Sequence, residues 1–162
     1  MAEPAPLSPE EWAFWDAWMQ GQRLLAREVE RALQHDFGIS KAEFSILVKL
    51  QAAPGGRMRV TDLADSLDWD KSRVAHQLTR MEVRGLLERS ESGAAGRRTG
   101  IALTKSGEEV AERAILGHGR NIRRLALDRL SPEQAAAIGA WSHQLITDLG
   151  ADAPSSASAG NV

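Results

Sequence analysis

The sequence predicts a mainly helical fold with one small β-hairpin, which places it in the α+β class. Apolar residues recur at helical spacing over most of the 162 residues, a pattern typical of amphipathic helices. Serine, proline, glutamate and glycine signals divide this pattern into separate helices. A glycine-rich stretch near residue 95 lies between two short strand-forming segments. A chain of this length is expected to form one domain.

Two capping boxes predict the first two helices. Ser8 is followed by proline and then by Glu11, so a helix is expected from there to about residue 36, stopping at Gly38. Ser40 and Glu43 repeat the pattern and open a second helix, which should end at the next Pro-Gly-Gly run.

The next segment predicts a helix-turn-helix unit. Residues 58–60 are long enough only for a strand stub, and Thr61-Asp62 is expected to cap a short helix. Asp68-Trp69 forms the expected turn, and Asp70 caps a second helix that runs to Arg84 and stops at Gly85. Two short helices joined by a three- to four-residue turn are typical of this motif.

A β-hairpin and two further helices complete the predicted fold. Leu86–Arg89 and Thr99–Leu103 are the expected strands, and the flexible loop between them carries two arginines. Thr104 is expected to cap a long helix through about Arg129, and Ser131 opens the last helix. Within the long helix His118 lies between two glycines, which indicates a close helix contact or a bend.

Positive charge is concentrated around the predicted second helix of the motif and the hairpin. Between Lys71 and Lys105 there are eight Lys and Arg against three Glu, whereas the whole chain has a net charge of −2. A helix and a loop with such side chains can contact base edges and phosphates of duplex DNA. The alternative is an ordinary solvated surface, and the helix-loop pattern favours DNA binding. The candidate DNA-binding residues are Lys71, Ser72, Arg73, His76, Gln77, Arg80, Arg97 and Arg98.

Other classes of function have little support in the sequence. The chain has no cysteine, and its four histidines lack metal-binding spacing, so we expect no metal site and no cofactor. No nucleophile motif or phosphate loop is present, and we expect no catalytic residue and no enzyme activity. No apolar run is long enough to span a membrane and no signal peptide is evident, so a cytoplasmic protein without a membrane partner is expected.

Three segments together resemble the MarR family of bacterial transcription regulators: VTDLADSL, DKSRVAHQLTRMEVRGLLER and RRTGIALTKSG. The resemblance implies a winged helix-turn-helix protein that binds a palindromic operator as a homodimer and regulates transcription, as a repressor or an activator. One departure is Ala95, where the family usually carries an aspartate that fixes the wing arginine. The implied organisation is a single domain over 8–149, with a DNA-binding lobe at about 40–104, dimerisation helices at about 8–37 and 104–149, and flexible tails at 1–7 and 150–162.

The last helix supports the dimer independently of the resemblance. Ile138, Trp141, Leu145 and Leu149 form an apolar stripe that needs a partner surface, and intertwined terminal helices of two chains would provide one. The alternative is packing of these helices within one chain.

The resemblance also implies an effector, a small aromatic or anionic molecule bound between the dimerisation helices and the DNA-binding lobe. The candidate ligand-binding residues are Trp15, Trp18, Met19, Phe44 and Trp69. For any one of them, a place in the core or the dimer interface is the simpler interpretation. The alternative function is a small-molecule-binding or protein-interaction module of the same fold that does not bind DNA.

Overall fold

The computed structural model describes residues 5–90 and 100–150, and it confirms the predicted fold class. Helices predominate, and three short strands form one antiparallel sheet in the order β1-β3-β2. The helices are α1 Pro9–Phe37, α2 Lys41–Ala52, α3 Val60–Leu67, α4 Lys71–Val83, α5 Lys105–Leu125 and α6 Pro132–Gly150, and the strands are β1 Arg57–Arg59, β2 Leu87–Ser90 and β3 Gly100–Leu103. Two 3₁₀ turns, Pro54–Gly56 and Leu127–Arg129, follow α2 and α5.

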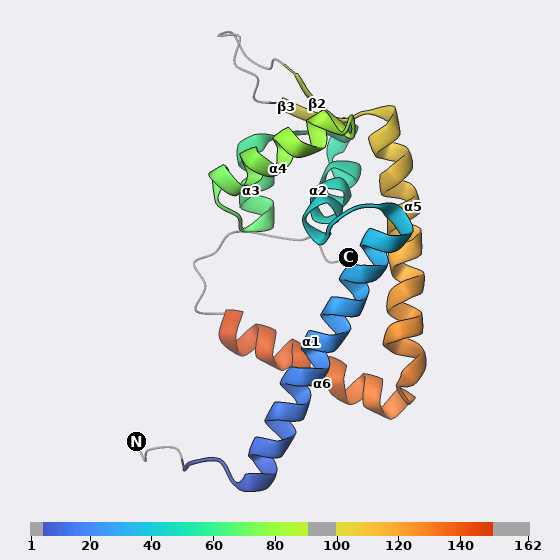
Figure 1. The fold of residues 1–162 in the computed structure, drawn as a ribbon. Coiled ribbons are helices and arrows are strands. Elements are labelled where there is room, and N and C mark those ends of the chain that lie inside the picture. Colours follow the sequence, from blue (N-terminus) through green and yellow to red (C-terminus); the bar gives the residue numbers. More distant parts are fainter. Residues whose placement is uncertain (1–4, 91–99, 151–162) are drawn as a thin grey trace.

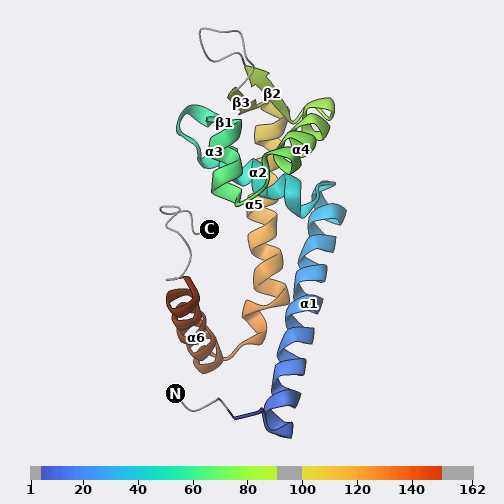
Figure 2. The ribbon, with the colours of Figure 1, turned by 90° about the vertical axis from the view of Figure 1, so that its left-hand side faces the viewer.

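The elements form one compact lobe from which two long helices extend. Figure 1 shows α2, α3, α4 and the sheet gathered at the top, with α1 and α5 running away from them. The helix α1 packs along α5, whereas α6 stands apart from most of α1 when the molecule is turned (Figure 2). A contact between Trp18 and Trp141, with ring centroids 5.2 Å apart, joins α6 to α1.

The hydrophobic core lies inside the compact lobe. Strand β3 is its centre, since it pairs with both other strands and all four of its residues are buried. The largest fully buried side chains come from α2, α3, α4, the strands, the adjoining end of α1 and the short link between α1 and α2. They are Leu33, Ile39, Ile46, Leu47, Leu50, Leu63, Val74, Leu78, Met81, Leu87 and Ile101.

Most of the helix boundaries follow the predicted signals. Ser8 and Ser40 each form a complete capping box, and α1 ends at Gly38 with a left-handed φ of 65°. Gly85, with φ 69°, ends the turn after α4 in the same way. The cap at Thr104 is also confirmed, because its hydroxyl accepts a hydrogen bond from the Gly107 amide.

Glycine lets α5 approach its neighbours closely at two positions. A Cβ atom at Gly117 would overlap the ring of Phe37 in α1, and one at Gly107 would overlap the backbone carbonyl of Leu86. The glycines beside His118 were predicted to indicate either a close contact or a bend. For Gly117 the structure supports the contact.

Two predicted boundaries were wrong. Thr61-Asp62 does not cap α3, because the strand pairing of β1 ends at Arg59 and the chain enters the helix directly at Val60. The start of α4 after Asp70 is as predicted, although the Asp70 side chain makes no capping hydrogen bond. The helix α5 ends at Leu125 rather than about Arg129, because the backbone leaves the helical region at the next residue.

Within the described ranges, none of the helices combines the length and the apolar character that a membrane span requires.

Candidate nucleic-acid interface

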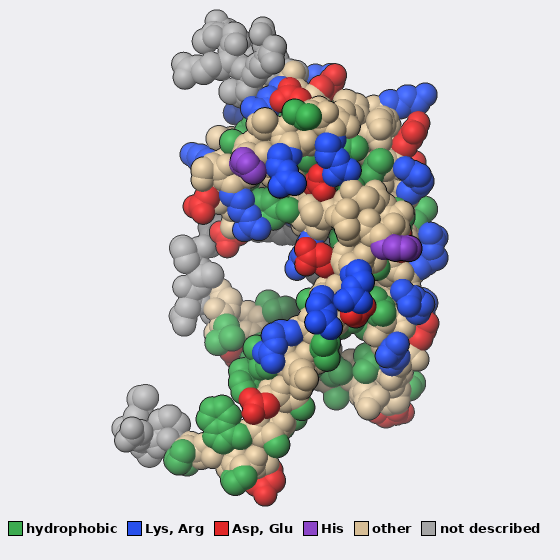
Figure 3. Space-filling view, viewed as in Figure 1, with side chains coloured by type: hydrophobic (Ala, Val, Ile, Leu, Met, Phe, Trp, Pro, Cys, Tyr) green, Lys and Arg blue, Asp and Glu red, His purple; other side chains and the backbone are tan. Residues whose placement is uncertain are grey.

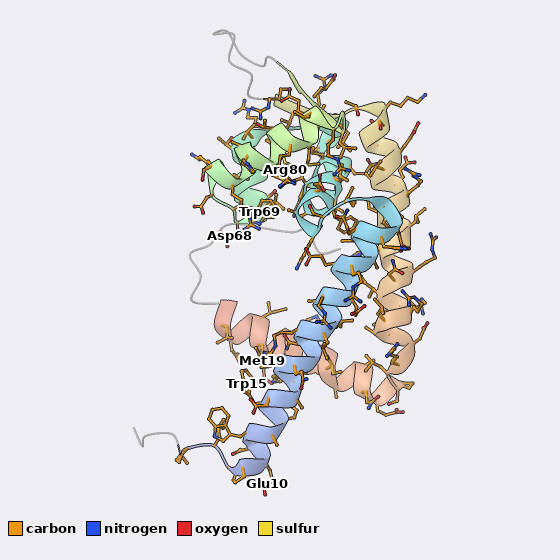
Figure 4. All side chains as sticks on the ribbon, in the orientation of Figure 1. Glu10, Trp15, Met19, Asp68, Trp69 and Arg80 are labelled. Carbon is orange, nitrogen blue, oxygen red and sulfur yellow. The ribbon has the colours of Figure 1, made fainter. Side chains whose placement is uncertain are left out.

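The helix α4 has one buried face and one solvent-exposed polar face. Val74, Leu78 and Met81 recur at helical spacing and are buried in the core. The predicted DNA-binding residues lie on the other side: Lys71, Ser72, Arg73, His76 and Arg80 are exposed, and Gln77 is half-buried. Figure 4 labels Arg80 on this lobe, and Figure 3 shows Lys and Arg side chains spread over the same region.

Two of the basic residues counted near α4 are held in internal ion pairs. Arg84 donates hydrogen bonds to the Glu43 carboxylate and to the carbonyl oxygen of Gly38. Arg89 forms an ion pair with Glu82 at 3.2 Å and donates a hydrogen bond to Thr79 at 3.0 Å. The positive charges of Arg84 and Arg89 are therefore largely neutralised within the protein. The excess of positive charge that can contact DNA phosphates is smaller than the count of Lys and Arg in the sequence suggests.

The buried partner of Arg84 is an ionised carboxylate. Glu43 is 4% exposed, and burial alone would raise its pKa. Hydrogen bonds from the Ser40 backbone, the Arg84 side chain and the Ser40 hydroxyl outweigh burial, so the pKa of Glu43 lies below its ordinary value. This network ties the end of α4 to the start of α2.

The strand β1 supplies two exposed cations that the sequence interpretation missed. Arg57 and Arg59 are exposed, and Met58 between them is half-buried. Because side chains alternate across a strand, both arginines share the face that points away from the core. The alternation of Arg, Met and Arg was the signal that could have identified them.

The predicted wing arginines lie outside the described residues. Arg97, Arg98 and the unusual Ala95 all fall between residues 91 and 99. The strands on either side are described and pair antiparallel, with Ser90 opposite Gly100 at the end nearest this segment.

The predicted ligand-binding residues fall in three places in the single chain. Trp15, Trp18 and Met19 lie on α1 far from the compact lobe, whereas Trp69 lies in the turn before α4 (Figure 4). Phe44 lines a cavity of about 290 Å³ between α1, α2 and α5. The structure therefore does not bring these five residues together within one chain.

The cavity beside Phe44 contains four polar residues that were not predicted for it. Glu30, Lys41, Ser45 and His118 line it together with apolar residues of α1, and the rings of Phe44 and His118 lie 4.5 Å apart between centroids. The Nδ1 atom of His118 is buried and has no hydrogen-bond partner among the described residues. Burial, followed by the nearby charge of Lys41, lowers the pKa of His118 and favours its neutral form.

Two short helices joined by a tight turn and followed by a strand pair define a winged helix-turn-helix DNA-binding protein. The MarR family model matches residues 37–98. The structure of AbsC, a MarR family transcriptional regulator from Streptomyces coelicolor, is 31% identical over 92% of this chain and 100% of its own, with a TM-score of 0.78. The chain therefore belongs to the MarR family of transcriptional regulators.

Two further solved structures are similar. Sco3205, a MarR family regulator from Streptomyces coelicolor in complex with DNA, is 32% identical over 97% of each chain, with a TM-score of 0.77. The organohalide-sensing regulator RdhR in its 2,4-dichlorophenol-bound form is 19% identical over 90% of this chain and 86% of its own, with a TM-score of 0.71, and this likeness shows the fold alone. No curated protein matches the chain. The matches to regulators support double-stranded DNA as a partner.

Proposed function

We propose that this DNA-binding transcriptional regulator acts as a homodimer on a palindromic operator. The exposed face of α4, with Arg73, His76 and Arg80, carries this proposal, because it is a polar and basic helix surface that can enter a major groove. The wing arginines Arg97 and Arg98 would contact the adjacent backbone or minor groove. Since such a protein works on chromosomal DNA, the proposal also places it in the cytoplasm.

The exposed apolar side chains of the terminal helices support the dimer. None of the described residues of α6 is buried, and Ile146 and Leu149 are 70% and 72% exposed. On α1, Trp12 and Phe14 are 53% and 62% exposed. Apolar surface of this extent is typical of an interface, and a second copy would cover both helices at once.

The experiment on DNA binding starts with selection of sites from random duplex DNA by the full chain. We expect an inverted repeat, and we expect Arg97→Ala and Arg98→Ala to bind it more weakly. Each lost phosphate contact should flatten the plot of log affinity against log salt by about one unit. Arg23→Ala, an exposed cation on α1, is the matched control and should leave the slope unchanged. Wild-type slopes in both wing variants would remove the wing from the interface.

A second part of the proposal is that a small aromatic or anionic effector releases the protein from DNA. The cavity beside Phe44 supports it, because an aromatic ring, the cation of Lys41 and the imidazole of His118 line the same space as Glu30, Ser45 and apolar side chains of α1. The phenol-bound form of RdhR belongs to the same fold. Trp15, Trp18, Met19 and Trp69 remain predictions as ligand residues.

Release by an effector has a thermodynamic test. The protein should bind 2,4-dichlorophenol or 4-hydroxybenzoate more weakly when operator DNA is present. The affinity for the compound should fall by the same factor as the affinity for DNA falls when the compound is present. Lys41→Gln should lower the affinity for the anionic compound, 4-hydroxybenzoate. Lys49→Gln, on the same helix but outside the cavity, is the matched control. Equal affinities with and without DNA would exclude the compound as an effector.

The alternative function is a binding module of the same fold without DNA recognition. If the folded, dimeric wild-type chain selects no preferred DNA sequence, the result would favour the binding module over a regulator.

A further inference from the structure

The turn between α3 and α4 holds the ring of Trp69 in a fixed place. Asp68 adopts a left-handed conformation with φ 51°, and its amide donates to the carbonyl of Asp65. The Trp69 amide donates to the carbonyl of Ala64 at 3.0 Å. This pair of hydrogen bonds is a Schellman motif, which fixes the backbone directly after a helix. The side chain of Trp69 is half-buried and packs against the hydrophobic core.

The exposed side of this ring is covered by Arg73 from the first turn of α4. The guanidinium carbon lies 4.1 Å from the centroid of the Trp69 ring, within the range of a cation–π interaction. Within the described part of the chain, Arg73 forms no ion pair, so no carboxylate competes with the ring for its position. Its orientation is therefore set by the tryptophan.

A cation–π contact is compatible with base recognition by the arginine. The guanidinium donates its five N–H bonds within its own plane, so a ring against its face leaves these donors free. Arginine pairs most specifically with the O6 and N7 atoms of guanine through two such parallel bonds. A guanidinium held in advance loses less side-chain entropy when it forms this pair.

We propose that Trp69 is a positioning residue that sets the specificity of Arg73 for one base pair in each half-site. The inference rests on the proposed function, in which α4 enters the major groove. Trp69 does not touch the DNA in this arrangement. It acts by holding the arginine in the conformation that reads the base.

The experiment compares site preferences of full-length variants in selection from random duplex DNA. Arg73→Ala should lose the preference at one base pair per half-site. Trp69→Leu, which keeps an apolar side chain but has no π face, should weaken the preference at that same base pair by about two- to fivefold. The double variant should match Arg73→Ala alone, and Trp69→Phe should restore most of the preference.

Two controls separate positioning from a structural role. His76→Ala should change the preference at its own base pair, and Trp69→Leu should leave the preference at that base pair unchanged. Trp69→Leu should also leave the salt dependence of DNA affinity unchanged. In the free wild-type protein, the Arg73 Hδ protons should show an upfield ring-current shift that persists in the DNA complex. If Trp69→Leu fails to fold, the absence of this shift from the wild-type protein or from its DNA complex still refutes the inference.

Four outcomes would overturn the inference. The first is a loss of affinity in Trp69→Leu that is spread over all base pairs or is fully additive with Arg73→Ala. The second is an Arg73 signal with no ring-current shift. The third is a wild-type chain that selects no sequence, which overturns the proposed function as well. A selected site whose Arg73 base pair is untouched in Trp69→Leu would overturn the inference alone.

Discussion

The compact lobe and the terminal helices use the same kinds of apolar side chain in opposite ways. From α2 to β3 most large aliphatic residues are buried by their own chain, with the exception of Val83, whereas the described residues of α6 include none that is buried. The same contrast divides α1, in which Leu33 near the lobe is 1% exposed and Phe14 at the far end is 62% exposed. The first region is a complete core, and the second is one side of the proposed dimer interface.

The joint between the two regions combines apolar contacts, such as that of the Phe37 ring with Gly117, with a polar network. Asn121 of α5 donates a hydrogen bond to Asp36 at the end of α1, and Arg84 after α4 bonds to Gly38 and Glu43. The hydrogen bonds from His35 and then Asn121 lower the pKa of Asp36. Directional bonds fix the angle at which α1 leaves the lobe, while non-directional apolar packing stabilises the lobe itself.

The largest effect is expected from a charge placed on the exposed stripe of α6. Leu145→Asp would bury an unpaired carboxylate in the proposed interface, at a cost of several kcal/mol. We expect a monomer or an aggregate in sedimentation and loss of operator binding. Gln144→Asp introduces the same charge at the neighbouring position and should remain a dimer. A dimeric, DNA-binding Leu145→Asp protein would remove this part of α6 from the interface.

A smaller effect should come from the close contact between α5 and α1. Gly117→Ala places a methyl group against the Phe37 ring, and such overpacking costs about 1–3 kcal/mol. Gly119→Ala, two residues further along the same helix, meets no atom within 4 Å in the described chain and should stabilise the protein by roughly 1 kcal/mol. Thermal unfolding of the two variants should therefore shift in opposite directions. Equal shifts would show that the contact at Gly117 is unimportant.

The smallest effect concerns the polar joint. Arg84→Ala removes a partly exposed partner from buried Glu43, and a loss of about 1–2 kcal/mol at neutral pH is expected after allowance for solvent screening. Because the pKa of Glu43 is lowered on folding, its stabilising contribution is present above its ordinary value of 4.5 and is lost as pH falls through the folded pKa. The penalty of Arg84→Ala should shrink over the same range.

The control for the polar joint is Arg80→Ala, one turn earlier on α4, where the side chain is exposed. It should change the free energy of unfolding by less than about 0.5 kcal/mol at every pH. Denaturant unfolding between pH 7 and 3 measures both variants. An Arg84→Ala penalty that does not vary with pH would contradict the ionised state of Glu43.

Local signals in the sequence predicted most of the fold. The caps at Ser8, Ser40 and Thr104 and the stops at Gly38 and Gly85 depend on neighbours only a few residues away, so the structure confirms them. The start of α3 depends instead on where β1 stops pairing with β3, a partner about forty residues distant. Thr61-Asp62 resembled a cap, and the tertiary contact overrode it.

The candidate site was predicted less completely for the same reason. The exposed face of α4 follows from helical periodicity, and its residues are placed as expected. The internal partners of Arg84 and Arg89 could not be read from charge alone, because pairing with Glu43 requires contact across 41 positions. The cavity of Phe44, Lys41 and His118 also joins residues from distant helices. The wing and the ligand residues stay predictions.

The hydrogen bond from Arg84 to Gly38 links the C-terminal end of α1 to the C-terminal end of α4, so a tilt of α1 would move α4. With 29 residues, this helix is about 44 Å long, and its end is fastened to the end of the helix proposed to read DNA. A tilt of about 5° at the far end would displace the fastened end by about 4 Å, close to the ~3.4 Å step between nucleotides along one strand. In the proposed dimer, small adjustments where the two copies meet would thus shift each helix α4 by about one base pair along the DNA.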